Sequence, residues 1–304
     1  MKVFNFGSIN IDHIYRVPHF VCPGETLPSQ KYQMMLGGKG ANQSIALARA
    51  GVLVQHIGRI SVHDEWICRK LQQNGVGVYC LKQVEEPTGH AVIQVNDAGE
   101  NAILLFGGAN RGFAKPELVE YLNNSQPGDW LLLQNECNLT AEVLQLAKQH
   151  QMTVAFNPAP MSKAVLDLPM DNVDYLIVNE IEAEGLVNDA DLGAGQPEAL
   201  LGRLHQRYPH LKIVLTLGER GVRYKDAEQT LSVPAEVVDV VDTTAAGDTF
   251  IGYFIQQLVV GESVKDALEM ANRAAAVTVQ TLGASESIPY IAQLIGDETN
   301  HQDD

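Results

Sequence analysis

A short polar stretch, Asp-Thr-Thr-Ala-Ala-Gly-Asp, ends at Asp248 and runs directly into an apolar segment that is typical of a buried helix. Ala246, Gly247 and Asp248 are therefore expected in the first turn of that helix, where free backbone N–H groups bind anions. The Asp248 carboxylate beside them can accept a proton from a hydroxyl group, and phosphoryl transfer to an alcohol needs both features. A local alternative is that Thr243 or Thr244 caps the helix while Asp248 merely complements its dipole.

Other polar residues stand where predicted strands end, at the edge where open α/β sheets bind ligands. They are amides, carboxylates, a lysine and glycines, which suit a polyhydroxylated ligand because each hydroxyl both donates and accepts. Each one alone could equally be a turn or cap residue. These candidate ligand-binding residues are Asn10, Asp12, Gly38, Lys39, Gly40, Asn42 and Glu136.

A second polar set follows later strands. Asn179 and Glu182 lie at a predicted helix start and could hold a hydrated Mg²⁺ through its waters, although Asn179 capping the helix with Glu182 explains them locally. The segment Thr-Leu-Gly-Glu-Arg-Gly at 216–221 ends another strand and could line a nucleotide with backbone groups. A P-loop is excluded because Lys39 is followed by glycine, and no glycine pattern has Rossmann spacing.

The composition narrows the possible partners. The chain has 304 residues and a formal net charge of −16, which opposes general binding to nucleic acid or to an anionic membrane. Its four cysteines have no C-x-x-C spacing, the start of the chain does not resemble a signal peptide, and no apolar run is long enough for a membrane span. We therefore expect a cytoplasmic protein.

Apolar patterns predict alternating strands and helices. This alternation favours a largely parallel sheet covered on both faces. Strands are expected at 2–9, 54–59, 130–133, 154–157, 175–178 and 212–217, and helices at 41–50, 66–73, 140–150, 181–187, 198–208 and 245–260, with a further helix after Ser263.

A β-hairpin pattern interrupts this alternation of strands and helices. The apolar runs 91–95 and 102–106 flank turn residues, and together with 11–15 and 31–36 they could form a small separate sheet. Such a sheet is a candidate lid or dimer contact, and the alternative is an ordinary antiparallel edge.

A series of segments occurs in the order found in the ribokinase (PfkB-type) carbohydrate kinase family, which the chain resembles over nearly its whole length. They are Gly-Ser-Ile-Asn-Ile-Asp at 7–12, Pro-Gly-Glu-Thr at 23–26, Gly-Gly-Lys-Gly-Ala-Asn-Gln at 37–43, Asn-Pro-Ala-Pro at 157–160, Asn-Glu-Ile-Glu-Ala-Glu at 179–184, Thr-Leu-Gly at 216–218 and the stretch ending at Asp248. The resemblance implies one domain over 1–296, a three-layer α/β/α core with a mostly parallel sheet, and a polar tail at 297–304. It also implies a β-sheet lid formed by about 11–36 and 89–110, through which a homodimer assembles.

The activity that this resemblance implies is ATP-dependent phosphorylation of a sugar hydroxyl. Asp248 resembles the catalytic base, Ala246 and Gly247 resemble the anion hole, and the candidate ligand-binding residues above together with Asp248 resemble the sugar site. Glu182 resembles the magnesium side of the nucleotide site. The residues that resemble the ATP side are Asn179, Thr216, Gly218, Glu219, Gly221, Gly247 and Asn272.

A loop that binds a monovalent cation such as K⁺ in the family also has a counterpart. The matching positions depart from the commonest pattern at Thr244, Thr278 and Thr281, which is tolerable where the ligand is a backbone carbonyl. The full set is Asp242, Thr244, Thr278, Thr281, Gly283 and Ser287.

The Gly-Gly-Lys-Gly loop and the Asn-Pro-Ala-Pro segment look most like family members that act on a free pentose. We therefore expect D-ribose to be converted to ribose 5-phosphate. Two alternatives stay open: a kinase of the same family for another sugar or a nucleoside, and a sugar- or nucleotide-binding regulator without catalysis. A pure binding protein would have no need of a base at Asp248.

Overall fold

Short buried strands build the centre of the molecule. The computed structural model describes residues 1–187 and 196–295, and within these ranges one sheet has the order β13-β12-β11-β10-β9-β8-β1-β4-β5. Its strands from β5 to β11 are parallel, whereas β12 and β13 run antiparallel at one edge. The strands are β1 (Val3–Phe6), β4 (Val54–Ser61), β5 (Leu81–Val84), β8 (Trp130–Leu133), β9 (Thr153–Phe156), β10 (Tyr175–Asn179), β11 (Lys212–Thr216), β12 (Val222–Lys225) and β13 (Thr230–Val233).

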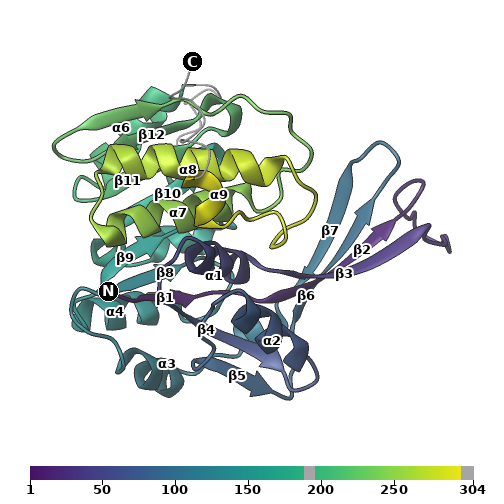
Figure 1. Cartoon of the computed structure of the whole chain (residues 1–304). Helices are drawn as coiled ribbons and strands as arrows, with labels where there is room; N and C mark the ends of the chain where they lie inside the picture. The colour runs from purple at the N-terminus through teal and green to yellow at the C-terminus, as the bar shows by residue number, and fades with distance from the viewer. Residues whose placement is uncertain (188–195, 296–304) are drawn as a thin grey trace.

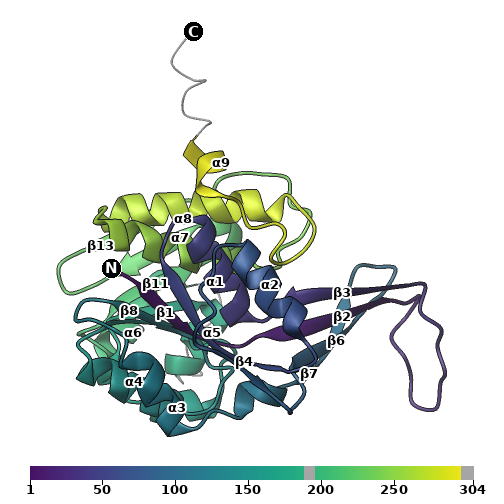
Figure 2. The same ribbon diagram turned by 60° about the horizontal axis from the view of Figure 1, so that its bottom comes forward.

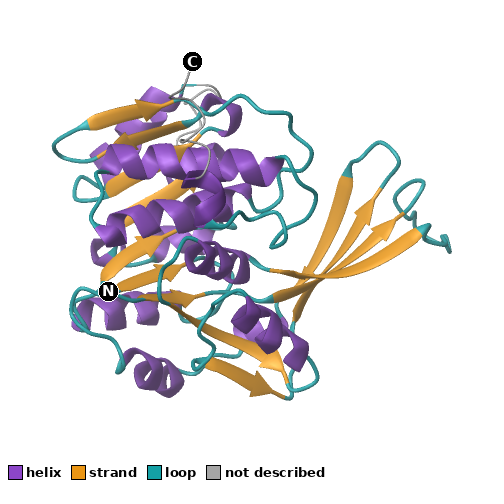
Figure 3. Cartoon of the chain, viewed as in Figure 1, coloured by secondary structure: helices purple, strands orange, loops and turns teal. Residues whose placement is uncertain are grey.

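Helices cover both faces of this sheet (Figures 1 and 3). Alternate strand residues feed two separate cores: Leu132 of β8 packs into one, and Leu131 and Leu133 pack into the other. The first core takes α1 (Lys39–Arg49), α2 (Glu65–Gln73), α7 (Ala246–Val260), α8 (Val264–Val279) and α9 (Ile291–Ile295), and the second takes α3 (Lys115–Leu122), α4 (Thr140–Gln149), α5 (Glu180–Val187) and α6 (Pro197–Arg207). Short 3₁₀ turns are η1 (Gly108–Arg111), η2 (Lys163–Asp167), η3 (Met170–Asn172) and η4 (Gly218–Arg220).

A second sheet, here called the lid sheet, projects from the main body (Figures 1 and 2). It has the order β3-β2-β6-β7, with β2 and β6 parallel and both outer pairs antiparallel. Its strands are β2 (Asn10–Arg16), β3 (Lys31–Gly37), β6 (Gly89–Val95) and β7 (Asn101–Phe106). The chain first enters it just after β1 and leaves it into α1, and it returns after β5 to form β6 and β7. The lid sheet therefore joins the main body beside the start of α1.

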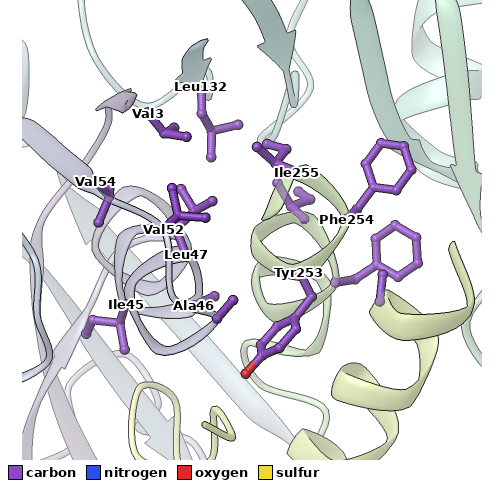
Figure 4. Packing of buried hydrophobic residues seen from close by; sticks show 14 of the residues in the cluster. Val3, Ile45, Ala46, Leu47, Val52, Val54, Leu132, Tyr253, Phe254 and Ile255 are labelled. Carbon is purple, nitrogen blue, oxygen red and sulfur yellow. The ribbon is translucent and has the colours of Figure 1, made fainter. Parts of the chain in front are cut away.

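Helices α1 and α7 approach each other closely. Ala46 of α1 and Tyr253, Phe254 and Ile255 of α7 belong to the same buried cluster (Figure 4). The approach depends on Gly252, because an added Cβ would lie 2.4 Å from the Ala46 Cβ and 3.0 Å from the Ala46 carbonyl carbon. This contact sets how close the first turn of α7 comes to α1.

Most predicted elements are confirmed within a few residues, including the small separate sheet and the start of α8, where the Ser263 hydroxyl accepts a hydrogen bond from the Asp266 N–H. The first strand is shorter than predicted, because the chain breaks at Gly7 to cross between sheets. As a result Asn10 and Asp12 lie within β2 and not in a loop after a strand. Strands β5, β12 and β13 and helices α3 and α9 were not predicted, because each is only four to eight residues long and too short for a clear apolar period.

Two further expectations concern the chain as a whole. The polar tail at 297–304 lies outside the described residues. Among the described helices, none is long and apolar enough to cross a membrane.

Replacing Gly252 by alanine tests the helix contact. We expect Gly252→Ala to lower the free energy of unfolding by roughly 1–2 kcal/mol, because overpacking costs more than the alanine gains in helix propensity. Gly202 in α6 is the matched control, since a Cβ there meets nothing within 4 Å. Gly202→Ala should be neutral or stabilising by up to about 1 kcal/mol. Urea unfolding measures both, and equal stabilities would contradict the close contact.

Candidate active site

The first turn of α7 begins without a side-chain cap. Ala245 precedes the helix with φ 62°, a left-handed conformation that costs a non-glycine residue on the order of 1–3 kcal/mol. The Ala246 N–H donates to the Thr243 carbonyl at 3.3 Å, whereas the structure gives the N–H groups of Gly247 and Asp248 no acceptor among the described residues. Capping by Thr243 or Thr244 is therefore wrong, and the turn exposes backbone donors to an anion.

The Asp248 carboxylate points across to α1. Asn42 Nδ2 donates to its Oδ2 at 3.1 Å, and Gln43 Nε2 donates to its Oδ1 at 2.9 Å. Because each carboxylate oxygen has its own amide donor, the group has a fixed orientation. Asp248 is thus more than a complement to the helix dipole.

Charges surround this carboxylate. Burial raises the pKa of Asp248, and Lys39 and the amide hydrogen bonds oppose that shift. Burial would lower the pKa of Lys39, but the carboxylates of Asp248, Glu136 and Glu182 outweigh it and raise that pKa. Lys39 therefore stays protonated and offsets part of the local negative charge.

The predicted sugar residues gather between α1 and the lid sheet. Ser8 Oγ donates to Glu136 Oε2 in a short hydrogen bond, and the Lys39 N–H donates to the same oxygen at 3.3 Å. Asp12 packs against the backbone of Gly37, and burial, together with the nearby Glu136 carboxylate, raises the pKa of Asp12 to about 6. The result is a polar wall beside Asp248.

Glycines and an asparagine hold this wall in place. Gly38 precedes α1 with φ 93°, and a Cβ there would meet the Asn10 nitrogen at 2.9 Å. Gly40 lies against Gly7, with 2.5 Å from an added Cβ to the Gly7 Cα. Asn110 donates to Asn10 Oδ1 at 2.9 Å, which fixes the amide of Asn10. The chain crossing between the sheets is therefore tightly positioned.

On its other side Asp248 lines a pocket of about 200 Å³. The pocket joins residues predicted for the sugar, magnesium and nucleotide sides. Its lining includes Lys39, Asn157, Asn179, Glu182, Thr216, Thr243, Ala245, Gly247 and Asp248. A larger depression of about 670 Å³ at the β5 and α3 edge contains none of the predicted site residues.

Asn179 and Glu182 form a capping pair at the start of α5. The Glu182 N–H donates to Asn179 Oδ1 at 2.9 Å, and the Asn179 N–H donates back to Glu182 Oε2 at 3.0 Å. The local explanation is confirmed, and Asn157 Nδ2 also reaches Glu182 at 3.2 Å. Burial raises the pKa of Glu182, against the effects of these hydrogen bonds and of Lys39. Among the described residues, no cluster of three metal-binding side chains occurs.

Several predicted nucleotide residues lie away from this pocket. Gly218 and Glu219 are exposed in η4. Gly221 comes next in the chain after Arg220 and has φ 82°. A Cβ there would lie 2.2 Å from the Val233 carbonyl oxygen, so the absence of a side chain allows β13 to pack closely against this turn. Asn272 of α8 donates to the Pro234 carbonyl at 2.9 Å.

Some of the predicted cation-site residues converge. Asp242 Oδ1 accepts from the Thr244 N–H at 2.9 Å, and its Oδ2 accepts from the Gly283 N–H at 3.1 Å. Burial alone would raise the pKa of Asp242, but these hydrogen bonds and one from the Thr244 hydroxyl lower it. The Ser287 hydroxyl donates to the Gly283 carbonyl at 2.8 Å. The segments around Asp242 and Gly283 are thus joined.

The other two predicted cation residues are oriented differently. The Thr278 hydroxyl is buried in α8 and bonds to Thr249 and Ala274. Thr281 is exposed, and its N–H reaches the Thr278 carbonyl at 3.3 Å. The Thr278 hydroxyl is thus engaged within helices α7 and α8.

Sequence reasoning missed several polar residues that hold the site. Ser8 binds Glu136, Asn110 fixes Asn10, and Gln43 binds Asp248. Gln43 carried a usable signal, because three consecutive polar residues, Asn42, Gln43 and Ser44, are followed directly by the apolar part of a predicted helix. Ser8 and Asn110 depend on long-range pairing and gave none.

The comparisons agree with this arrangement. A family model described as pfkB family carbohydrate kinase matches residues 1–291. The ribokinase of Haemophilus influenzae is 35% identical over 288 residues, which cover 93% of this chain and 94% of that protein. A crystal structure of ribokinase from Cryptococcus neoformans var. grubii in complex with ADP is 35% identical, with a TM-score of 0.87 over 97% of this chain and 99% of that one.

A further solved structure is that of Arabidopsis thaliana ribokinase complexed with ribose and ATP. It is 27% identical, with a TM-score of 0.86 and coverage of 97% of each chain. The predicted three-layer core with a smaller second sheet is confirmed by these structures and by the topology. With a family match over nearly its whole length, the chain belongs to the PfkB family of carbohydrate kinases.

Proposed function

We propose that the chain transfers the γ-phosphoryl group of ATP to the primary hydroxyl of D-ribose and so forms ribose 5-phosphate. The observation that carries this proposal is the position of the Asp248 carboxylate. It is held by two α1 amides between the wall around Asp12 and Glu136 and the pocket along Asn179 and Thr216. One carboxylate can therefore face a sugar and a nucleotide together.

In the proposed reaction the sugar oxygen attacks the γ-phosphorus in line with the leaving oxygen of ADP. The new O–P bond forms as the bond to ADP breaks, and Asp248 takes the hydroxyl proton. The N–H groups of Gly247 and Asp248 face the negative charge of the transferring group, and Lys39 adds a positive charge beside it. The Ala246 N–H is already bonded to Thr243, so it contributes less than predicted.

The polar wall suits a free pentose. Asp12, Asn10 and Glu136 supply acceptors and an amide, and the glycine backbone at 38–40 allows a sugar ring to approach closely. Asn42 lies beside them, with its Nδ2 group bonded to Asp248. The same residues could also bind deoxyribose, which has one hydroxyl group fewer and would therefore make one hydrogen bond fewer.

The nucleotide and its Mg²⁺ belong on the pocket side. Asn179 and Thr216 lie opposite each other on β10 and β11 and line the pocket. Bound Mg²⁺ would neutralise phosphate charge, and Glu182 would hold it through waters, since its carboxylate is already engaged by Asn179 and Asn157. The need for ATP supports a cytoplasmic location, which cell fractionation would test.

We also propose a K⁺ site where the segments at 242–244 and 283–287 meet. The donor set fits, because it consists of a carboxylate, a hydroxyl and backbone carbonyls, which are oxygen ligands. A cation there would order the turn that leads into Ala246 without touching the sugar.

A homodimer through the lid sheet is the expected assembly. Edge strand β7 exposes apolar residues on both its faces: Ile103, Leu104, Leu105 and Phe106 are 49% to 72% exposed. On β3, Tyr32 and Met34 are about half exposed as well. A second copy of this chain would cover these side chains, and an exposed apolar edge strand would otherwise promote aggregation.

The direct test of function is ADP release from Mg-ATP with ribose, deoxyribose, fructose, tagatose or adenosine. Ribose should give the highest kcat/KM, and chelation with EDTA should stop turnover.

Asp248→Asn should lose roughly 100- to 10,000-fold in kcat while ribose binding, measured by calorimetry, stays nearly normal. Sugar binding without turnover in the wild-type protein would instead support a binding regulator.

The proposed K⁺ site is tested by measuring turnover with and without K⁺. Turnover should be faster in KCl than in tetramethylammonium chloride at equal ionic strength, and Asp242→Ala should abolish that difference. Asp239→Ala is the control, because Asp239 is exposed and lies outside the joined segments. Equal rates in both salts would rule out the proposed K⁺ site.

The dimer is tested by sedimentation at several protein concentrations. We expect Leu104→Asp to give a monomer, because the charge would have to be buried in the partner interface. Leu53→Asp serves as a matched control, since Leu53 is 71% exposed elsewhere on the molecule. A wild-type monomer at micromolar concentration, or a Leu104→Asp dimer, would contradict the assembly.

A further inference from the structure

A chain of buried amides leads to Asp248 from the interior of the main sheet. Gln43 Nε2 donates to Asp248 Oδ1, and Gln134 Nε2 donates to Gln43 Oε1 at 2.5 Å and to Asn5 Oδ1 at 3.0 Å. Asn5 Nδ2 in turn donates to the Gly40 carbonyl at 2.8 Å. The three amide side chains are almost completely buried, although they come from β1, α1 and the end of β8.

Each amide group in this hydrogen-bond network can have only one orientation. The Gly40 carbonyl can only accept a hydrogen bond, so Asn5 must turn its NH₂ group toward it and its oxygen toward Gln134. Gln134 must then present NH₂ to Asn5, and the same NH₂ group reaches the oxygen of Gln43. Gln43 is left with its NH₂ group facing Asp248.

We infer that Asn5 and Gln134 are positioning residues for the reaction, because they fix the amide of Gln43 so that it donates to the catalytic carboxylate. This inference rests on the proposed function of Asp248. A free glutamine could present either its oxygen or its NH₂ group, and its oxygen would repel the carboxylate. The backbone at Gly40 thus sets the orientation of a side chain at the opposite end of the network.

This arrangement leaves one buried oxygen atom without a hydrogen bond. Gln134 Oε1 has no hydrogen-bond partner among the described residues, and it lies where a Cβ on Gly7 would come within 2.4 Å. Leaving a buried carbonyl unpaired costs on the order of 1–3 kcal/mol. Turning the amide over would set its oxygen against the oxygens of Asn5 and Gln43.

The far end of the network does not titrate near neutral pH. Asn5 Nδ2 also donates to Ser44 Oγ, which bonds to His56 Nδ1 at 2.8 Å. Burial lowers the pKa of His56 to about 4, so the imidazole is neutral in the assay range. Charged groups that act on Asp248 from its surroundings are Lys39 of α1, Glu136 after β8 and Glu182 of α5.

The test changes the direction of the hydrogen bonds at Gln134, a residue that does not line the pocket beside Asp248. Gln134→Glu removes the NH₂ group, so the amide of Gln43 should turn and present its oxygen to Asp248. A carboxylate that loses a donor has a higher pKa. The acidic limb of the kcat/KM profile should therefore move to higher pH, and kcat at pH 7 should fall by roughly ten- to a hundredfold. Ribose affinity should change little.

Other variants separate this effect from a general loss of structure. Gln256→Glu is the matched control, because Gln256 is buried in α7 at 7% exposure and is not linked to the network. It should lower stability without moving the pH profile. Gln43→Met should reproduce the defect, and Gln134→Met should give a smaller shift, since it frees the Gln43 amide without forcing it to turn.

The carboxyl ¹³C resonance of Asp248, assigned with Asp248→Asn, gives a readout that does not need activity. Its titration should move to higher pH in Gln134→Glu and Gln43→Met and stay unchanged in Gln256→Glu. If Gln134→Glu does not fold, Gln134→Met is decisive. An unshifted titration in the folded Gln134 variant overturns the inference. Shifted titrations in a protein that phosphorylates no sugar would retain the orientation of the Gln43 amide toward Asp248 and refute the proposed function.

Discussion

The contact between the Asp248 carboxylate and the amides of α1 is the interaction on which the site depends. It crosses between two helices distant in sequence, and it exists only because those helices lie close together. Gly252 permits that approach, and Gly40 permits α1 to begin against the turn after β1. Packing at glycine positions therefore determines the geometry of a hydrogen bond, and that hydrogen bond determines where a proton can be accepted.

Electrostatic balance is the second constraint. The chain carries a net charge of −16, yet its proposed substrates include a polyanion. Lys39 stands among Asp248, Glu136 and Glu182, and free N–H groups lie at the start of α7. Positive potential is thus supplied locally. The strained backbone of Ala245 is consistent with a turn shaped for function and not for stability alone.

Much of this could be predicted from the sequence, because local patterns carry it. The alternation of apolar strands and helices gave the layered core, the hairpin residues indicated the second sheet, and the turn before Phe250 indicated the helix start. Long-range partners could not be predicted. Nothing near Ser8 indicates Glu136, and nothing near Gln134 indicates Gln43. Asn179 and Glu182 show the opposite case, in which a local capping pattern is real whatever else the residues do.

A crystal structure with ribose and a non-hydrolysable ATP analogue would test the central claim most directly. The primary hydroxyl of the sugar should lie within hydrogen-bonding distance, about 3 Å, of the Asp248 carboxylate. The γ-phosphate should meet the N–H groups of Gly247 and Asp248, with the amides of Asn42 and Gln43 still bonded to the carboxylate. A sugar whose primary hydroxyl points away from Asp248, or a phosphate bound away from the start of α7, would contradict the account.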